Sequence, residues 1–292
     1  MKDRGIPWRA RLAAALVDVS PQWGVMAACK AVGAAARVKI PRAVTRPAIA
    51  AYVRYFDVDL GDVDRGAHEA GYDSFDAFFT RRLRRGARTI DRSTAAIVSP
   101  CDGLLREVVE IRDGLTIDAK GHALSLGELL ADEGLAGRFE GGCAATIYLH
   151  PRDYHRVHAP CDALAEEVVL VPGRLLPVTD AALDRVPTLF TLNERLIHVL
   201  DTIHGAMAVV MIAAFGVGHM SCAYRHVAPH PSAIQRVTCD PQPRLRKGDE
   251  LGIFHLGSTV VLVTERGTRP IVESVPSKVR LGQAILQGSG KP

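Results

Sequence analysis

The sequence has 292 residues, 48% of them hydrophobic and 23% charged, which is enough chain for one large domain or two small ones with a substantial core. This composition excludes a small disulfide-bonded scaffold and a wholly disordered chain, and no repeat of fixed period is visible. The formal net charge of +4 is unevenly spread, because residues 1–56 hold ten basic and two acidic side chains.

The N-terminal 56 residues have a helical pattern. Apolar side chains recur every three or four residues in two stretches, at Trp8, Leu12, Leu16 and Val19 and, after Pro41 and Pro47, at Ile49, Tyr52, Val53 and Phe56. We therefore expect two or three short amphipathic helices. Such helices usually pack on their own domain with a solvated charged face, but basic side chains beside aromatic ones also favour an anionic lipid surface.

Residues 71–92 combine an aromatic cluster with an arginine-rich run. Tyr72, Phe75, Phe78 and Phe79 have helical spacing, and six arginines follow within the next 13 residues. A charge run is usually a solvated face, and no helix-turn-helix, zinc-finger or RNA-binding signature accompanies this one. We therefore expect no nucleic-acid partner.

From Ile97 onward the pattern changes to short apolar runs separated by Gly, Pro and Asp, which is typical of β-strands. The predicted strands are 104–111, 144–149, 164–171, 195–200, 206–215 and 259–263, and residues 125–133 are predicted to be helical. The sequence thus predicts an α+β fold, with a β-rich catalytic domain and N-terminal amphipathic helices.

Two further patterns bear on cellular setting. The longest strictly apolar run, 206–215, is about half of the roughly 20 residues that a membrane-spanning helix needs, and no secretory signal is recognisable. The six cysteines form no C-x-x-C pair and have no histidine at zinc-finger spacing. We expect reduced cysteines, a cytosolic setting and no metal site.

Three polar clusters could carry chemistry. They are the turn 99–103 with Asp102, the segment 148–160 with His150, His155 and His158, and the segment 255–259 with His255, Gly257 and Ser258. Each of the two turn sequences, taken alone, is a common Asp or Gly-Ser turn. Histidines near neutral pH favour acid/base chemistry over metal ligation here, because no carboxylate or cysteine stands at a recognised ligand spacing.

Together, in this order, the three clusters resemble the phosphatidylserine decarboxylases of the prokaryotic type. Tyr-Leu-x-Pro-Arg-Asp-Tyr-His-Arg-Val-His-x-Pro (148–160) is similar to the family's signature, and Leu-Gly-Ser-Thr (256–259) is similar to the site where the proenzyme cuts itself. Similar segments occur in family order at 78–83, 99–103, 119–122, 171–173, 189–195 and 247–254. Cys101, His150 and the stretch 175–180 depart from the family pattern.

The resemblance implies a role for each site residue. Ser258 would attack the Gly257 carbonyl, with His158 as base and Asp102 orienting His158, and would end as a pyruvoyl group that serves as the covalent cofactor and Schiff-base electrophile. His155 would be the acid that reprotonates the α-carbon after CO2 leaves. The roles of His150 and His255 stay open.

The implied enzyme is a carboxy-lyase of phospholipid biosynthesis that converts phosphatidylserine to phosphatidylethanolamine. We expect a helical membrane-association region over 1–70 and a catalytic domain over 71–292, cut into a large chain 1–257 and a small chain 258–292 that stay together. The expected location is peripheral, on the cytoplasmic face of the cell membrane at an anionic surface, and a homodimer is left open. The alternatives are a non-cleaving lipid-binding relative and a decarboxylase of another serine-headgroup lipid.

Overall fold

The computed structural model describes residues 22–112, 116–119, 122–216 and 219–289. The amphipathic helix predicted around Leu12 lies outside the described residues. The helices near the N-terminus are α2 (Gln22–Arg37), α3 (Arg42–Phe56), α4 (Arg65–Ala70) and α5 (Phe75–Phe79). Those within the β-rich part are α6 (Leu126–Leu130), α7 (Glu133–Gly137), α8 (Asp180–Arg185) and α9 (Leu189–Leu192).

The largest sheet of the described residues has nine antiparallel strands. Its order is β11-β7-β8-β9-β14-β5-β2-β16, and β12 also pairs with β7. These strands are β2 (Gly103–Glu110), β5 (Cys143–Leu149), β7 (Ala163–Val171), β8 (Arg195–Thr202), β9 (Gly205–Ala213), β11 (Gln235–Thr238), β12 (Arg244–Leu245), β14 (Ser258–Thr264) and β16 (Ser277–Val279).

Three smaller sheets accompany it. One has the order β10-β13-β6 and contains β6 (Arg156–His158), β10 (His219–Cys222) and β13 (Glu250–His255). A second has the order β1-β17-β15 and contains β1 (Ala96–Val98), β15 (Thr268–Pro270) and β17 (Ala284–Gly288). The third is the hairpin of β3 (Thr116–Ala119) and β4 (His122–Ser125).

The β-rich α+β prediction is confirmed, and all six predicted strands coincide with strands of the main sheet. All but the last two residues of the apolar run 206–215 lie in β9, whose residues are all buried between β8 and β14. A strand flanked by neighbours on both edges and covered on both faces has no polar face, which explains its unbroken apolar sequence. No described helix is both long and apolar enough to cross a membrane.

Two helix predictions need correction in detail. The predicted helix 125–133 is two short helices, because Ala131 ends α6 in the left-handed conformation (φ 52°) and Asp132 caps the start of α7. Pro47 does not interrupt the N-terminal helical pattern but lies inside α3, where it leaves one backbone hydrogen bond unmade. Neighbouring turns and tertiary packing retain the helix around it.

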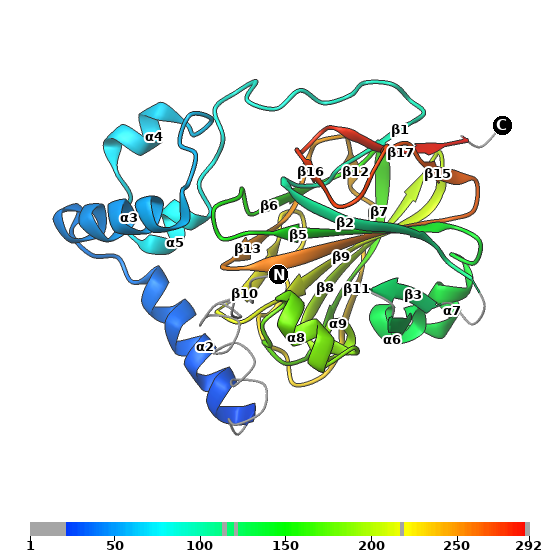
Figure 1. The fold of residues 1–292 in the computed structure, drawn as a ribbon, viewed down its shortest axis with the longest axis horizontal. Helices are drawn as coiled ribbons and strands as arrows, with labels where there is room; N and C mark the ends of the chain where they lie inside the picture. The colour runs from blue at the N-terminus through cyan, green and yellow to red at the C-terminus, as the bar shows by residue number, and fades with distance from the viewer. Residues whose placement is uncertain (1–21, 113–115, 120–121, 217–218, 290–292) are drawn as a thin grey trace, which may run out of the picture.

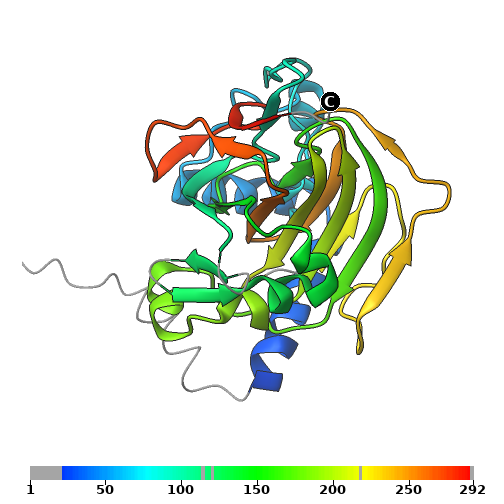
Figure 2. The same cartoon turned by 90° about the vertical axis from the view of Figure 1, so that its right-hand side faces the viewer.

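Helices α2 to α5 lie together on one side of the strands, and in the view turned by 90° they lie behind them (Figures 1 and 2). Helix α3 is fixed by hydrogen bonds from Thr45 to Tyr72 O (2.7 Å) and from the Tyr52 hydroxyl to Pro151 O (2.8 Å). The second of these bonds joins the helices directly to the histidine-rich segment.

The predicted domain boundary at residues 70 and 71 stays a prediction, and apolar contacts cross it. A small cluster contains Ile49 and Val58 on one side of that point and Tyr72 and Phe78 on the other. Cys29 of α2 is 1% exposed and belongs to the core of the β-rich part. The N-terminal helices therefore share buried contacts with the strands. All six cysteines are free thiols.

Candidate active site

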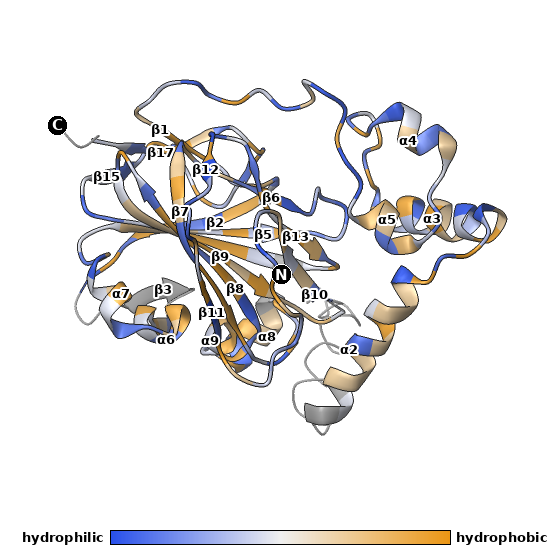
Figure 3. Cartoon of the chain, turned by 180° about the vertical axis from the view of Figure 1, so that it is seen from behind, coloured by the Kyte–Doolittle hydropathy of each residue, from blue (hydrophilic) through white to orange (hydrophobic). Residues whose placement is uncertain are grey.

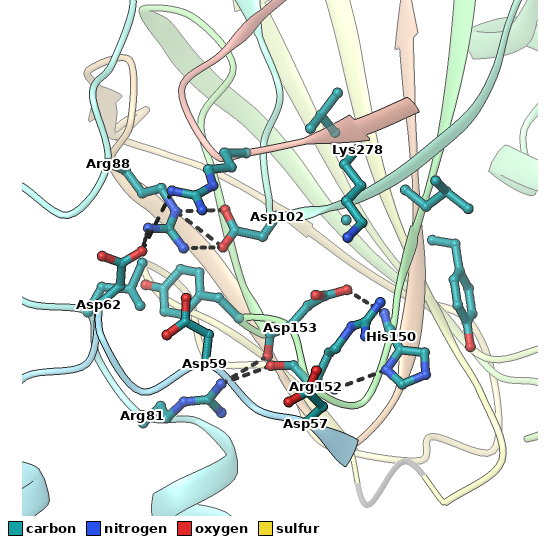
Figure 4. Close-up of a pocket in the computed structure, with 17 residues that line it drawn as sticks. Asp57, Asp59, Asp62, Arg81, Arg88, Asp102, His150, Arg152, Asp153 and Lys278 are labelled. Carbon is teal, nitrogen blue, oxygen red and sulfur yellow. Dashed lines mark hydrogen bonds and ion pairs between the residues drawn. The ribbon is translucent and has the colours of Figure 1, made fainter. Parts of the chain in front are cut away.

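A cavity rich in charged groups lies between the N-terminal helices and the edge of the main sheet at β2 and β16 (Figure 4). Its charged lining residues are Asp57, Asp59, Asp62, Arg81, Arg88, Asp102, Arg152, Asp153, Lys278 and Arg280. Tyr148, His150 and Tyr154 also face it. We call it the charged cavity.

Asp102 lies in the turn between β1 and β2 and is held by three donors. Arg88 donates from Nε to Oδ1 (2.9 Å) and from Nη2 to Oδ2 (2.5 Å), and the backbone N–H of Leu281 donates to Oδ1 (2.8 Å). Arg88 also bonds Asp62 (2.6 Å), and this hydrogen bond lowers the pKa of the Asp62 carboxyl. Charge-assisted hydrogen bonds of this kind fix the orientation of the Asp102 carboxylate.

His158 lies on β6 with both ring nitrogens engaged. Nδ1 is 2.9 Å from the carbonyl of Gly248, which only accepts, so Nδ1 carries the proton. Nε2 therefore accepts from the Tyr154 hydroxyl at 3.1 Å. Burial lowers the pKa of His158, so the ring is neutral at pH 7.

The structure brings the Asp102 turn and His158 into neighbouring segments without pairing their side chains. The backbone N–H of His158 donates to Pro100 O at 2.8 Å, two residues before Asp102. Within the described part of the chain, the ring is oriented by Gly248 and Tyr154, and the Asp102 carboxylate is oriented by Arg88 and Leu281. Orientation of His158 by Asp102 stays a prediction. For the two side chains to bond each other, His158 would have to leave Gly248 or Tyr154, and Asp102 would have to leave Arg88 or Leu281.

His155 is fully buried and has one unusual nitrogen. Its Nδ1 donates to the carbonyl of Asp153 (2.9 Å), and its ring lies 4.1 Å from the Phe79 ring, centroid to centroid. Nε2 is buried with no hydrogen-bond partner among the described residues. Burial lowers the pKa of His155 to about 3. A buried acceptor without a partner is costly in a core.

The Gly257–Ser258 bond joins the small sheet to the main sheet. Leu256 (φ 88°) and Gly257 (φ 43°) both have positive φ, and Ser258 then begins β14 between Leu149 of β5 and Ala213 of β9. The side chain of Ser258 lies outside the described residues.

A second, apolar cavity lies at this bond. It is lined by Val32, Ala36, Tyr52, Phe56, Phe75, Phe79, Pro151, Phe215, Gly216, Leu256 and Gly257. The segment 150–154 separates the two cavities, since Pro151 lines the apolar one and its neighbours line the charged one. Phe79 connects the apolar cavity to His155, because it lines that cavity and its ring packs on the His155 ring. A charged cavity and an apolar one thus meet at this segment.

Sequence reasoning missed several residues that organise the site. Tyr154 and Asp153 stand within the histidine-rich segment, and Gly248 stands in the 247–254 segment. These motifs included the three residues but did not indicate what each of them contacts. Arg88 belonged to a run interpreted as a solvated face, yet its side chain is only 11% exposed. His150 lies in the charged cavity, with its ring 6.0 Å from that of Phe56.

The described residues contain no group of three or more His, Cys, Asp or Glu side chains that could hold a metal ion. A turn of positive φ follows β13, and the titratable groups of the site are carboxylates held by arginine and the buried neutral His155 and His158, of which His158 lies opposite Glu250 in the β6–β13 register. These are groups for proton transfer.

Comparison with known proteins agrees with this chemistry. The phosphatidylserine decarboxylase family model matches residues 75–287, a range that includes the histidine-rich segment 148–160 and the Gly257–Ser258 bond. A protein of Azotobacter vinelandii named phosphatidylserine decarboxylase proenzyme is 41% identical over 89% of this chain and 93% of its own. Proteins of the same name from Bordetella petrii (40% identical, 87% of this chain, 90% of its own) and Myxococcus xanthus (37%, 87%, 91%) are also similar. The chain belongs to the phosphatidylserine decarboxylase family of enzymes.

Proposed function

We propose that the protein cuts itself between Gly257 and Ser258 and then decarboxylates phosphatidylserine to phosphatidylethanolamine. The observation that supports this most is the position of the Gly257–Ser258 bond. It follows two residues of positive φ and lines an apolar cavity whose Phe79 packs on the orphaned His155. Relatives named as proenzymes of this activity cover nearly the whole chain.

In the proposed cleavage, the Ser258 hydroxyl adds to the carbonyl carbon of Gly257 and its proton passes to the departing amide nitrogen by way of a base. The C–N bond breaks and an ester with a free amine results. Elimination then releases the Gly257 carboxylate and leaves dehydroalanine, whose imine form takes up water and loses ammonia to give a pyruvoyl group. Each step conserves the atoms of the chain apart from the added water and the released ammonia.

His158 suits the role of base in this sequence. It is neutral at pH 7 because burial lowers its pKa, and its Nε2 carries the lone pair that takes the proton. The Tyr154 hydroxyl occupies that lone pair, so it must turn away before the proton moves. The Gly248 carbonyl holds the Nδ1 proton and stabilises the imidazolium that forms.

A pyruvoyl group made from Ser258 would follow directly after the turn at Leu256 and Gly257. A Cβ built on Gly257 would approach only the Phe215 carbonyl, at 3.7 Å, so the residue before Ser258 is not closely packed on that side. A carbonyl conjugated to the substrate nitrogen supplies the electron sink that decarboxylation needs. His155 Nε2, buried and unpartnered among the described residues, is the proposed carrier of the proton to the α-carbon.

The two cavities suit the two ends of the proposed substrate. Arginine and lysine side chains in the charged cavity attract phosphate and carboxylate groups, and acidic side chains there attract the ammonium group. Aromatic side chains of α3 and α5 in the apolar cavity offer contact to the lipid part. A zwitterionic headgroup with an extra carboxylate uses both kinds of charge.

The function is tested with purified protein and phosphatidylserine in detergent micelles. We expect phosphatidylethanolamine and CO2 in equal amounts, measured by mass spectrometry and by trapping of labelled CO2. A serine-headgroup lipid on a different backbone, assayed in parallel, decides between the proposed substrate and its alternative. A protein that remains one chain and forms neither product would instead be a lipid-binding relative, and the proposal would fail.

We further propose that the N-terminal helices bind the protein to an anionic membrane surface. Val32, Val38, Val44 and Tyr55 of this region are between 52% and 56% exposed, and Ile40 is 39% exposed. The exposed basic side chains of Lys30 in α2 and of Arg42 and Arg54 in α3 lie on the same two helices. Figure 3 shows apolar and hydrophilic segments alternating along α2 and α3, a pattern that favours an interfacial position.

A double variant tests this surface. Val44→Glu combined with Tyr55→Glu should weaken binding to vesicles that contain anionic lipid by about tenfold or more, because two apolar contacts are lost and two repelled charges are added. Vesicle sedimentation measures the bound fraction, and added salt should weaken the parent's binding without abolishing it. The matched control is Ile203→Glu with Ile271→Glu, two exposed apolar residues outside the helices. Equal loss in both double variants would exclude the helices as the membrane-binding surface.

A further inference from the structure

His255 is the last residue of β13 and stands two positions before Gly257. Its Nδ1 lies 2.8 Å from Oδ1 and 3.0 Å from Oδ2 of Asp76 in α5, and its Nε2 lies 3.2 Å from the Ser221 hydroxyl of β10. A carboxylate only accepts, so Nδ1 donates to Asp76, and Nε2 forms the hydrogen bond with the Ser221 hydroxyl. Both ring nitrogens are thus satisfied, and the ring has one fixed orientation.

A second histidine reinforces this arrangement. His219 pairs with His255 across β10 and β13, and their rings are stacked 3.8 Å apart at 11°. Arg37, the last residue of α2, lies with its guanidinium 3.3 Å from His219 Nδ1. His219 is neutral at pH 7, because burial and the neighbouring His255 and Arg37 lower its pKa to about 4. The stacked rings therefore do not repel each other as two cations.

The turn that follows His255 is held at both ends. Ser258 is fixed on the far side by strand pairing with Leu149 and Ala213 in the main sheet. Between these two anchors Leu256 has φ 88°, a conformation that is unfavourable for a residue with a branched side chain. Strained backbone persists only where its surroundings hold it, and here the surroundings are His255 on one side and β14 on the other.

We propose that His255, oriented by Asp76, is a positioning residue for self-cleavage that holds the Leu256–Gly257 turn in the conformation from which the bond is cut. The proposal rests on the proposed function, since it assigns to His255 a part in that cleavage. Proton transfer is assigned to His158, so His255 acts only through the backbone that it anchors. Because Asp76 and Arg37 come from α5 and α2, maturation would depend on correct docking of the N-terminal helices.

His255→Leu tests this proposal, because leucine has a similar volume and cannot bond Asp76 or Ser221. We expect the rate of appearance of the chain that begins at residue 258 to fall by about tenfold or more, since small displacements of reacting atoms have effects of this size. His255→Gln should recover most of the rate, because its amide can donate to Asp76 and accept from Ser221. The rates are measured on gels after synthesis of the full chain in a cell-free system, with circular dichroism and Tm recorded for each purified variant.

Asp76→Ala is the second variant and should slow cleavage to a similar extent, with His226→Leu, an exposed histidine on the loop after β10, as the matched control. Parental rates in folded His255→Leu and Asp76→Ala would overturn the inference. A His255→Gln protein as slow as His255→Leu would also overturn it, because the hydrogen bonds would then be irrelevant. A parent chain that never cleaves would instead reject the proposed function itself, so the two failures are distinguishable.

Discussion

Ser258→Ala should leave the protein as a single chain of 292 residues, whereas the parent should separate into two chains on a denaturing gel. The reason is that alanine has no hydroxyl to attack the Gly257 carbonyl, and no other group of the variant takes its place. Decarboxylation should be lost completely, because the electron sink is made from the same side chain. Gel electrophoresis and intact-mass measurement give the result directly.

The parent's small chain provides the sharper measurement. Its N-terminus should resist Edman degradation, and its mass should be one ammonia below that of the simple hydrolysis product. Ser274→Ala, at an exposed serine of the same small chain, is the matched control and should cleave as the parent does. A free serine amine at residue 258 would show ordinary proteolysis and would sink the pyruvoyl assignment.

His158→Ala and His155→Ala should fail at different stages. Without His158 the proposed base for the Ser258 proton is missing, so uncut protein should accumulate, and cleavage should slow by about 100-fold or more. Without His155 the chain should still cut, but decarboxylation should fall by about 100-fold to 10,000-fold, because only the later proton transfer is impaired. Band intensities measure the first step, and CO2 release per cut chain measures the second.

The pKa of His155 gives this division a physical basis. Burial lowers that pKa to about 3, so at pH 7 the ring is a neutral acceptor at Nε2 and must receive a proton before it can donate one. The ammonium of the proposed substrate carries such a proton and has to lose it to react. An uncut His155→Ala protein, or normal cleavage in His158→Ala, would contradict the division, and His226→Ala should change neither step.

Much of the fold followed from local patterns in the sequence. Apolar runs bounded by Gly, Pro and Asp predicted the strands of the main sheet, because strand burial selects apolar residues regardless of which strand lies alongside. The pairing order was not predictable in the same way. Strand β14 lies between β5 and β9, which are more than 40 residues away along the chain. The seven residues of β14 do not indicate which strands it pairs with.

Helix limits show the same division on a smaller scale. Pro47 was interpreted as an interruption, but Thr45 and Ile49 on either side of it are buried against the rest of the molecule and keep α3 helical. Residues 125–133 were interpreted as one helix, but Ala131 has positive φ and separates α6 from α7. At Pro47 the packing offsets the roughly 3 kcal/mol that proline costs inside a helix, and at Ala131 the backbone conformation ends α6 where the apolar pattern alone would continue it.

The sequence by itself determined the residue types of the site and the family to which the chain belongs, because these depend on motifs contiguous in the chain. Only the tertiary structure decided which groups meet: Arg88 with Asp102, Gly248 and Tyr154 with His158, and Asp76 with His255. It also decided the protonation of His155 and His158, since a histidine's pKa is set by burial and by neighbours that arrive from distant segments. Motifs record which side chains are present, whereas partners, burial and backbone strain arise only when the strands and helices that carry them are packed together.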